Sequence, residues 1–219
     1  MNNHLASFAR LLMGILFLLT LSNAGMCCGS GLLVIPTADT VGDGQYSGEF
    51  QTDGVVSGAA IHTVLINNQV GIGDRVEVGV DFVPRGTDST KVLGNFKYVA
   101  ATTKDNNFAV AFGLQDIARH KKPSFFGVTS TQTPLGRIHF GAMTVEAESC
   151  WIVGFEREFG KAKFMCDCTS AGVNPASIGL GYQFTPTFGI EGGVLLPGGG
   201  EKTEFSIHLV WNADLKSKK

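Results

Sequence analysis

The stretch Arg75-Val76-Glu77-Val78-Gly79-Val80-Asp81-Phe82-Val83 decides the fold class of this chain. Valine and phenylalanine occupy every second position, and Glu77, Gly79 and Asp81 lie between them. Successive side chains of a β-strand point to opposite faces, so this alternation predicts a strand with one apolar face and one polar or small face.

The same alternation recurs along the chain from Gln45 onward, with short polar or Gly/Pro breaks between the segments. Breaks such as 84–88 and 197–200 supply the residue types that form turns. We predict twelve strands: Tyr46–Thr52, Gly58–Ile66, Arg75–Val83, Val92–Ala101, Asn107–Gln115, Ser124–Thr131, Arg137–Thr144, Cys150–Arg157, Ala162–Ser170, Ser177–Phe184, Phe188–Leu196 and Thr203–Trp211.

Two architectures can use such strands. A soluble sandwich points its apolar faces inward, whereas a membrane barrel shows them to lipid and keeps polar or small residues in its lumen. Three features favour the barrel: polar faces rich in Gly and Ala, an even strand count, and strands near the roughly 9–11 residues of a tilted membrane strand. The sequence therefore predicts an all-β fold, a single antiparallel up-and-down β-barrel of about 12 strands preceded by a signal peptide. The alternative is a soluble periplasmic β-sandwich.

Residues 1–24 have the layout of a secretory signal peptide. Arg10 precedes an apolar run over 11–21, and small residues occupy the positions that a signal peptidase reads up to Ala24. The run is shorter than the roughly 20 residues of a membrane-spanning helix. We predict export with cleavage after Ala24. A lipid anchor at Cys27 is the alternative, because the residues before it resemble a lipobox.

The chain is expected to comprise a signal peptide (1–24), an N-terminal segment (25–44), a β-barrel domain (45–212) and a polar C-terminal tail (213–219). Its net charge of −2 implies no polyanion-binding surface, so nucleic acid is not an expected partner. The 29 glycines, the 16 phenylalanines and a charged fraction of 16% fit a sheet protein with an apolar surface. The expected partner is the lipid bilayer.

Four short segments carry a family resemblance: Gly31–Asp39 followed by Gly44-Gln45-Tyr46, then Asn95–Tyr98, Phe108–Ile117 and Ile178–Pro186. Together they resemble the YjbH-like outer-membrane proteins, in order and over most of the mature chain. The resemblance implies an outer-membrane β-barrel without an assigned molecular activity. It also implies an association with exopolysaccharide export and envelope assembly, with polysaccharide or envelope assembly proteins as partners.

The polar faces hold the residues that could carry chemistry. The candidate lumen polar network comprises Glu77, Asp81, Lys97, Arg137, His139, Glu204 and His208. The same faces hold Glu49, Lys163, Asp167 and Glu191. This mixture of charges is typical of a plugged, salt-bridged interior, whereas a strongly selective pore shows one dominant sign.

Catalytic and metal-binding signatures are weak. The chain has no Gly-x-Ser-x-Gly nucleophile elbow, and the spacing of Ser206 and His208 is ordinary for two residues on one strand face. The Cys-x-Cys spacing of Cys166 and Cys168 is not a zinc signature. We expect no enzymatic activity, no cofactor and no metal.

The expected function is a structural or export-accessory role in the cell envelope, at the outer membrane. A narrow passive diffusion channel is the second interpretation. A soluble binding module, periplasmic or secreted, is the third.

Cleavage after Ala24 is tested by N-terminal sequencing of the exported protein, which should begin at Gly25. Recovery of intact Met1 in the mature pool would contradict the prediction. An acylated Cys27 would replace it with the lipid-anchor interpretation.

Overall fold

The computed structural model describes residues 31–57, 60–85, 88–118, 122–145, 148–170, 176–198 and 202–216. The expected signal peptide, its cleavage site at Ala24 and Cys27 lie outside these residues. The twelve strands are β1 (Gln45–Val55), β2 (Ala60–Ile72), β3 (Val76–Arg85), β4 (Asp88–Thr102), β5 (Phe108–Ile117), β6 (Ser124–Thr133), β7 (Gly136–Val145), β8 (Glu148–Phe159), β9 (Ala162–Thr169), β10 (Ala176–Thr185), β11 (Phe188–Leu196) and β12 (Glu204–Asp214).

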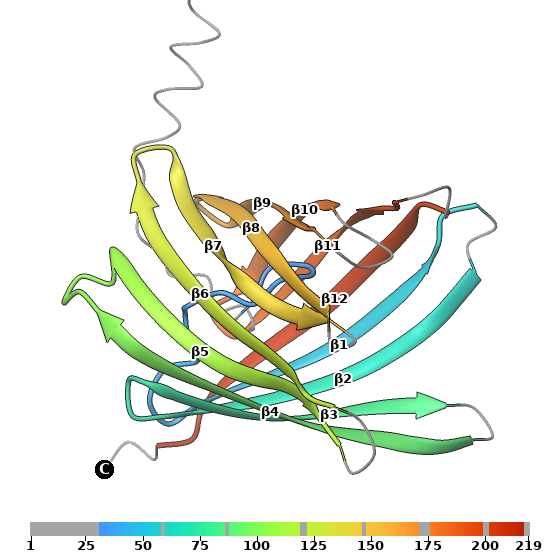
Figure 1. Ribbon diagram of the computed structural model, residues 1–219, viewed down its shortest axis with the longest axis horizontal. Helices are drawn as coiled ribbons and strands as arrows, with labels where there is room; N and C mark the ends of the chain where they lie inside the picture. The colour runs from blue at the N-terminus through green and yellow to red at the C-terminus, as the bar shows by residue number, and fades with distance from the viewer. Residues whose placement is uncertain are drawn as a thin grey trace, which may run out of the picture.

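The strands form one closed antiparallel barrel (Figure 1). Each strand pairs with its neighbours in sequence, and β1 pairs with β12 in a register that runs from Gln45↔Asp214 to Val55↔Glu204. The prediction of a single up-and-down barrel of about twelve strands is confirmed, and the β-sandwich alternative is wrong. Closure gives every strand a hydrogen-bonded neighbour on both sides, so the sheet has no edge strand.

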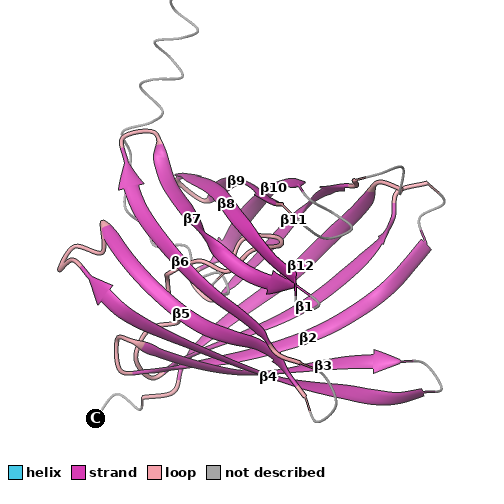
Figure 2. Ribbon diagram, in the orientation of Figure 1, coloured by secondary structure: helices cyan, strands magenta, loops and turns pink. Residues whose placement is uncertain are grey.

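Every predicted strand overlaps an observed one, but several observed strands are longer. The strand β2 continues to Ile72, past the predicted end at Ile66, through Asn67 and Gln69. These two polar side chains line the interior of the barrel. The described part of the chain consists of strands, turns and irregular segments (Figure 2). Within it, no helix is long and apolar enough to cross a membrane.

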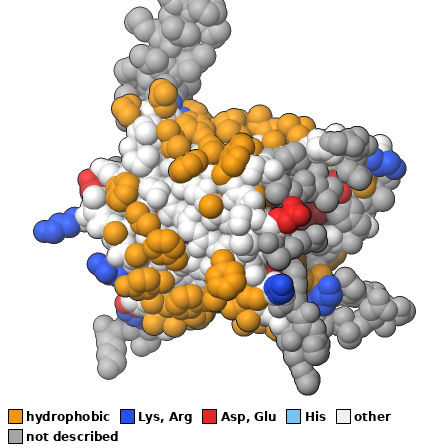
Figure 3. All heavy atoms as spheres, in the orientation of Figure 1, with side chains coloured by type: hydrophobic (Ala, Val, Ile, Leu, Met, Phe, Trp, Pro, Cys, Tyr) orange, Lys and Arg blue, Asp and Glu red, His pale blue; other side chains and the backbone are white. Residues whose placement is uncertain are grey.

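The two faces of the wall differ in chemistry. In β10 the outward residues Ile178, Leu180 and Tyr182 are exposed, while the inward residues between them are buried. Outward Phe140 and Leu180 have exposed fractions of 62% and 66%, and apolar side chains gather in several patches on the face drawn in Figure 3. The polar face of the alternating strands is therefore the inner face.

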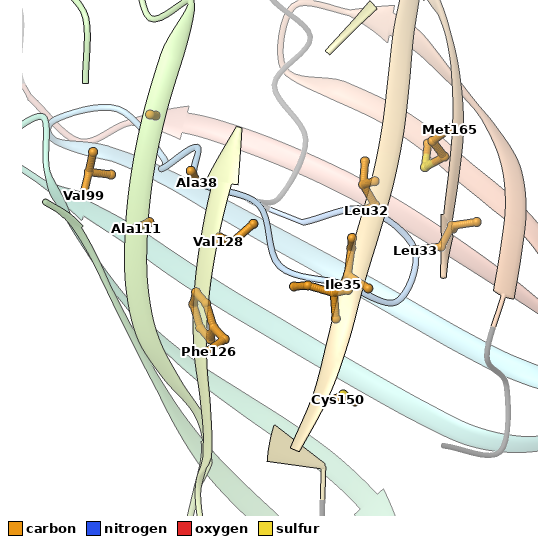
Figure 4. Close-up of a cluster of buried hydrophobic side chains, with 12 residues drawn as sticks. Leu32, Leu33, Ile35, Ala38, Val99, Ala111, Phe126, Val128, Cys150 and Met165 are labelled. Atoms are coloured by element: carbon orange, nitrogen blue, oxygen red, sulfur yellow. The ribbon is translucent and has the colours of Figure 1, made fainter. Parts of the chain in front are cut away.

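An irregular segment before β1 fills part of the interior. Residues 31–43, here called the plug, begin with a tight turn in which the Leu32 N–H donates to the Ile35 carbonyl over 2.9 Å. Leu32, Leu33 and Ile35 are buried in one apolar cluster with wall residues that include Phe126 and Met165 (Figure 4). Gly44 joins the plug to β1, and its N–H donates to the Gly71 carbonyl of β2.

Candidate functional site

Glycines on the inner wall make room for the plug. A Cβ atom at Gly154 of β8 would lie 2.5 Å from Leu32 Cδ1 and 2.8 Å from Ile35 Cδ1. A Cβ atom at Gly179 of β10 would lie 2.5 Å from Leu33 Cδ1. Complete burial of each of these large apolar side chains contributes about 1.5–3 kcal/mol. The small inner residues are therefore the contact surface of the plug.

An ion pair holds the C-terminal half of the plug to β7. Arg137 Nε donates to Asp39 Oδ2 over 2.9 Å, and a terminal guanidinium nitrogen donates to Asp39 Oδ1 over 2.7 Å. The other terminal nitrogen donates to the Asn106 carbonyl in the β4–β5 turn over 2.8 Å. Two parallel bonds between a guanidinium and a carboxylate fix orientation as well as distance. Asn106 Nδ2 also donates to Asp39 Oδ1 over 3.1 Å, so Asp39 is tied to β7 and to the β4–β5 turn.

The wall also satisfies backbone groups of the plug. Because the plug is irregular, its buried N–H and C=O groups need partners outside a strand ladder. The four bonds join Val34 N–H to Asp167 Oδ2 (3.1 Å), Ala38 N–H to Ser130 Oγ (2.9 Å), Val41 N–H to Glu77 Oε2 (2.8 Å) and Lys97 Nζ to the Asp39 carbonyl (2.8 Å). Charged inner residues therefore act as hydrogen-bonding partners of one particular segment.

The Ser130 hydroxyl that bonds to the Ala38 N–H belongs to a Ser–His–Glu chain in the wall. Ser130 Oγ is 2.7 Å from His139 Nδ1, and His139 Nε2 is 3.4 Å from Glu156 Oε1. Lys163 continues the chain, with Nζ 3.7 Å from Glu156 Oε2 and 2.6 Å from Glu191 Oε1. The chain links β6 through β9 to β11 across the interior.

A second Ser–His–Glu chain lies across β1 and β12. His208 Nδ1 is 3.0 Å from Glu49 Oε1, and His208 Nε2 is 2.7 Å from Ser206 Oγ. The Ser206 hydroxyl also donates to Asp53 Oδ1 over 2.5 Å. The chain reinforces the closure between the first and last strands.

Both chains have the residue types of a hydrolytic triad, but their serines are inaccessible. Ser130 and Ser206 have exposed fractions of 0% and 1%. A nucleophilic serine must reach the substrate atom that it attacks. Ser130 Oγ already accepts the Ala38 N–H, and Ser206 donates to a carboxylate. In this arrangement the two chains can stabilise the wall and the plug.

A cavity of about 400 Å³ remains between the plug turn and the inner wall, and residues of β1–β6, β11 and β12 line it. Its carboxylates are Glu49, Asp53, Glu77, Asp81, Asp116 and Glu191, and its basic side chains are Lys97 and His208. Within the described ranges, no group of three His, Cys, Asp or Glu residues could hold a metal ion.

The structure distributes the predicted polar residues over several clusters. Glu77 and Lys97 are paired across β3 and β4 at 3.6 Å, and both contact the plug. Arg137 contacts Asp39, and His139 and His208 belong to the two separate Ser–His–Glu chains. Asp81 lines the cavity, and Glu204 is half-buried at the start of β12.

Three important residues were absent from the sequence-based network. Ser130 and Glu156 occupy alternate inner positions of β6 and β8, so strand alternation could have identified them. Asp39 lies outside the strands, and its partner Arg137 is 98 positions away. The one sequence signal for Asp39 is its place in the opening segment that carries the family resemblance.

No family model matches the chain, and no curated protein matches it. Among solved structures, a loop L8 deletion mutant of OmpT, an outer membrane protein of Vibrio cholerae, is similar over 78% of this chain and 100% of that chain, with a TM-score of 0.40 and 10% identity. A protein of unknown function from the DUF3598 family of Nostoc punctiforme matches with a TM-score of 0.19 and 7% identity, over 78% of this chain and 96% of that chain. At these TM-scores neither structure bears on the function of this chain.

The contact between plug and wall predicts the effect of filling the space at Gly154. Gly154→Val should displace the plug turn, because its new side chain meets Leu32 and Ile35, and overpacking of this kind costs about 1–3 kcal/mol. A cysteine introduced as Leu33→Cys should then react with a water-soluble maleimide, as measured by mass spectrometry of the peptide containing position 33.

The matched control is Gly94→Val on the outer face, where a Cβ atom meets nothing closer than 3.6 Å. With Gly154 intact, or with Gly94→Val, the cysteine at position 33 should stay protected. Equal protection in the Gly154→Val protein, together with unchanged stability, would show that the plug does not contact Gly154.

Proposed function

We propose that the protein is an outer-membrane β-barrel with a structural or export-accessory role in the cell envelope, and that its own N-terminal segment closes its lumen. The observation that carries this proposal is the arrangement of the two wall faces. Apolar side chains face outward and paired charges face inward, which is the arrangement of a transmembrane barrel.

The outer face supports a position in lipid. Large apolar side chains that are exposed occur on strands around the barrel, including Phe82, Phe112, Phe125, Phe140, Leu180 and Ile207. Soluble monomers rarely expose continuous apolar surface of this extent. A closed barrel also satisfies its backbone internally, as hydrocarbon surroundings require.

Aromatic residues at one end of the barrel also support a position in the membrane. Tyr46, Tyr98, Phe108, Phe184, Phe188 and Trp211 lie at strand ends beside the short turns and the start and end of the barrel. Phe184 and Phe188 stack with ring centroids 5.8 Å apart. Aromatic girdles are typical of the membrane–water interface of such barrels.

The filled lumen favours an accessory role over free passage of solutes. The plug occupies the interior between the glycine-lined wall and the Asp39–Arg137 pair. Several inner charges of opposite sign are paired, as in Lys163–Glu191 and Lys97–Glu77. A strongly selective pore would present one dominant sign along an open path.

A link to polysaccharide export is supported by the sequence resemblance. The resemblance begins with Gly31–Asp39, and the structure places these residues in the plug. The shared opening segment therefore coincides with the part of the chain that fills the lumen.

A narrow passive diffusion channel is the second candidate, and the cavity beside the plug favours it. The cavity of about 400 Å³ is polar and reaches from Asp53 of β1 to Asp116 of β5. Conduction would require the plug turn to move, because Leu32 and Leu33 form one side of this cavity.

The membrane position is tested with spin labels on β12 in protein reconstituted into liposomes. Labels at Ile207 and Leu209, which face outward, should be relaxed by a lipid-soluble reagent, and a label at the inward, half-buried Glu204 should not. Ile207→Arg should destabilise the reconstituted barrel by roughly 2–4 kcal/mol if the position lies near the bilayer midplane.

Fractionation provides the control for localisation. The protein should be recovered with outer membrane and show heat-modifiable migration on a gel. Labels at 207 and 209 that are shielded from both lipid and water would mean that these residues pack against protein, and the membrane proposal would be wrong.

A further inference from the structure

The cavity beside the plug is large enough for a small molecule. Its volume of about 400 Å³ falls within the range of about 300–1,000 Å³ of small-molecule sites. Polar side chains from β1, β2, β3, β4, β5, β11 and β12 line it, and the plug turn forms one side. Among the charged side chains that line it, carboxylates outnumber basic groups.

Some of these carboxylates already have basic partners. Glu77 pairs with Lys97, Glu49 with His208, and Glu191 with Lys163. In contrast, the hydrogen bonds that Asp53 and Asp81 accept are donated by neutral side chains. Asp53 accepts from Gln51 and Ser206, and Asp81 accepts from Asn95.

Asp81 has an unused acceptor that is deeply buried. Its exposed fraction is 8%, and its Oδ2 atom accepts from Asn95 Nδ2 over 2.6 Å. Its Oδ1 atom is buried and has no hydrogen-bond partner among the residues that the structure describes. A buried acceptor without a partner destabilises the folded protein, and more so when it is charged. Because Asp81 lines the cavity and forms no ion pair with a described basic residue, a donor bound there would compensate its carboxylate.

A β-bulge brings a second carboxylate to the same part of the cavity. The β4–β5 register shifts between Gly94 and Phe96, opposite Asp116. The backbone of Asp116 has a φ of 60°. Its side chain is half-buried and lines the cavity. Its N–H donates to Asn95 Oδ1 over 3.2 Å, so Asn95 bridges the Asp81 side chain and the Asp116 backbone. Bulges re-aim side chains in this way beside functional sites.

We propose that this cavity binds a linear organic diamine or polyamine, with one ammonium group donating to the Asp81 carboxylate. An ammonium group has three donors and no acceptor, which matches a wall of carboxylate and amide oxygens. The carboxylates are spread over several strands, and no three of the described His, Cys, Asp or Glu residues form a metal-ion group. A chain with separated positive charges fits this distribution better than a single metal ion.

The proposal is tested by calorimetric titration of spermidine into the full-length barrel in detergent. The wild-type protein should bind spermidine saturably. Asp81→Asn should weaken binding about tenfold or more, because the buried partner of the ammonium group loses its charge. Asp116→Asn should also weaken binding, and its backbone should hold because asparagine tolerates a positive φ.

Asp74→Asn is the matched control, since it removes one negative charge from an exposed residue of the β2–β3 turn, which does not line the cavity. Its affinity for spermidine should equal that of wild type, and all variants should keep heat-modifiable migration. Four results would overturn the proposal: no saturable binding to folded wild type, equal affinity in Asp81→Asn, equal binding of the dicarboxylate adipate, or displacement of spermidine by Mg²⁺ at an equal concentration. The first two would not affect the membrane proposal, which the spin labels test independently.

Discussion

Insertion of the plug turn against the inner glycines is the contact on which the interior of this barrel depends. Eight-stranded barrels can fill their interior with their own side chains, whereas barrels of sixteen or more strands leave an aqueous channel. Twelve strands lie between these limits, and the inner faces here carry glycine at Gly154, Gly179 and Gly193. The space that these residues leave is occupied by Leu32, Leu33 and Ile35. The wall and the plug are therefore complementary in shape.

The same complementarity extends to charge. A carboxylate or ammonium group buried without a partner would be costly, and an irregular buried backbone would be costly as well. The wall avoids both costs, because a buried charged side chain and a backbone group of the plug bond to each other in three places. The wall residues are Asp167, Glu77 and Lys97. Loss of the plug would leave these charges without those bonds. The plug turn forms one side of the cavity at Asp81, but no described group bonds to Asp81 Oδ1.

Strand alternation was sufficient to predict the wall, because a period of two is imposed by the backbone itself. It also identified Glu77, Lys97, Arg137, His139 and His208 as inward residues, since each shares a face with small or polar neighbours. The plug has no such period. Its partners lie far along the chain, with separations of 98 residues for Asp39–Arg137 and 133 for Val34–Asp167, and single-sequence patterns carry no information about such pairs. The bulge at Asp116 was missed for a related reason: one extra residue shifts the register without changing the residue types.

Ion conductance across planar bilayers tests the central claim most directly, namely that the N-terminal segment closes the lumen of a membrane barrel. Full-length protein should insert and show no large steady conductance, because the plug is held by buried apolar contacts and by the Asp39–Arg137 pair. Gly154→Val, which displaces the plug turn, should raise the conductance above that of wild type. A large, steady conductance of the wild-type protein that Gly154→Val leaves unchanged would contradict the claim.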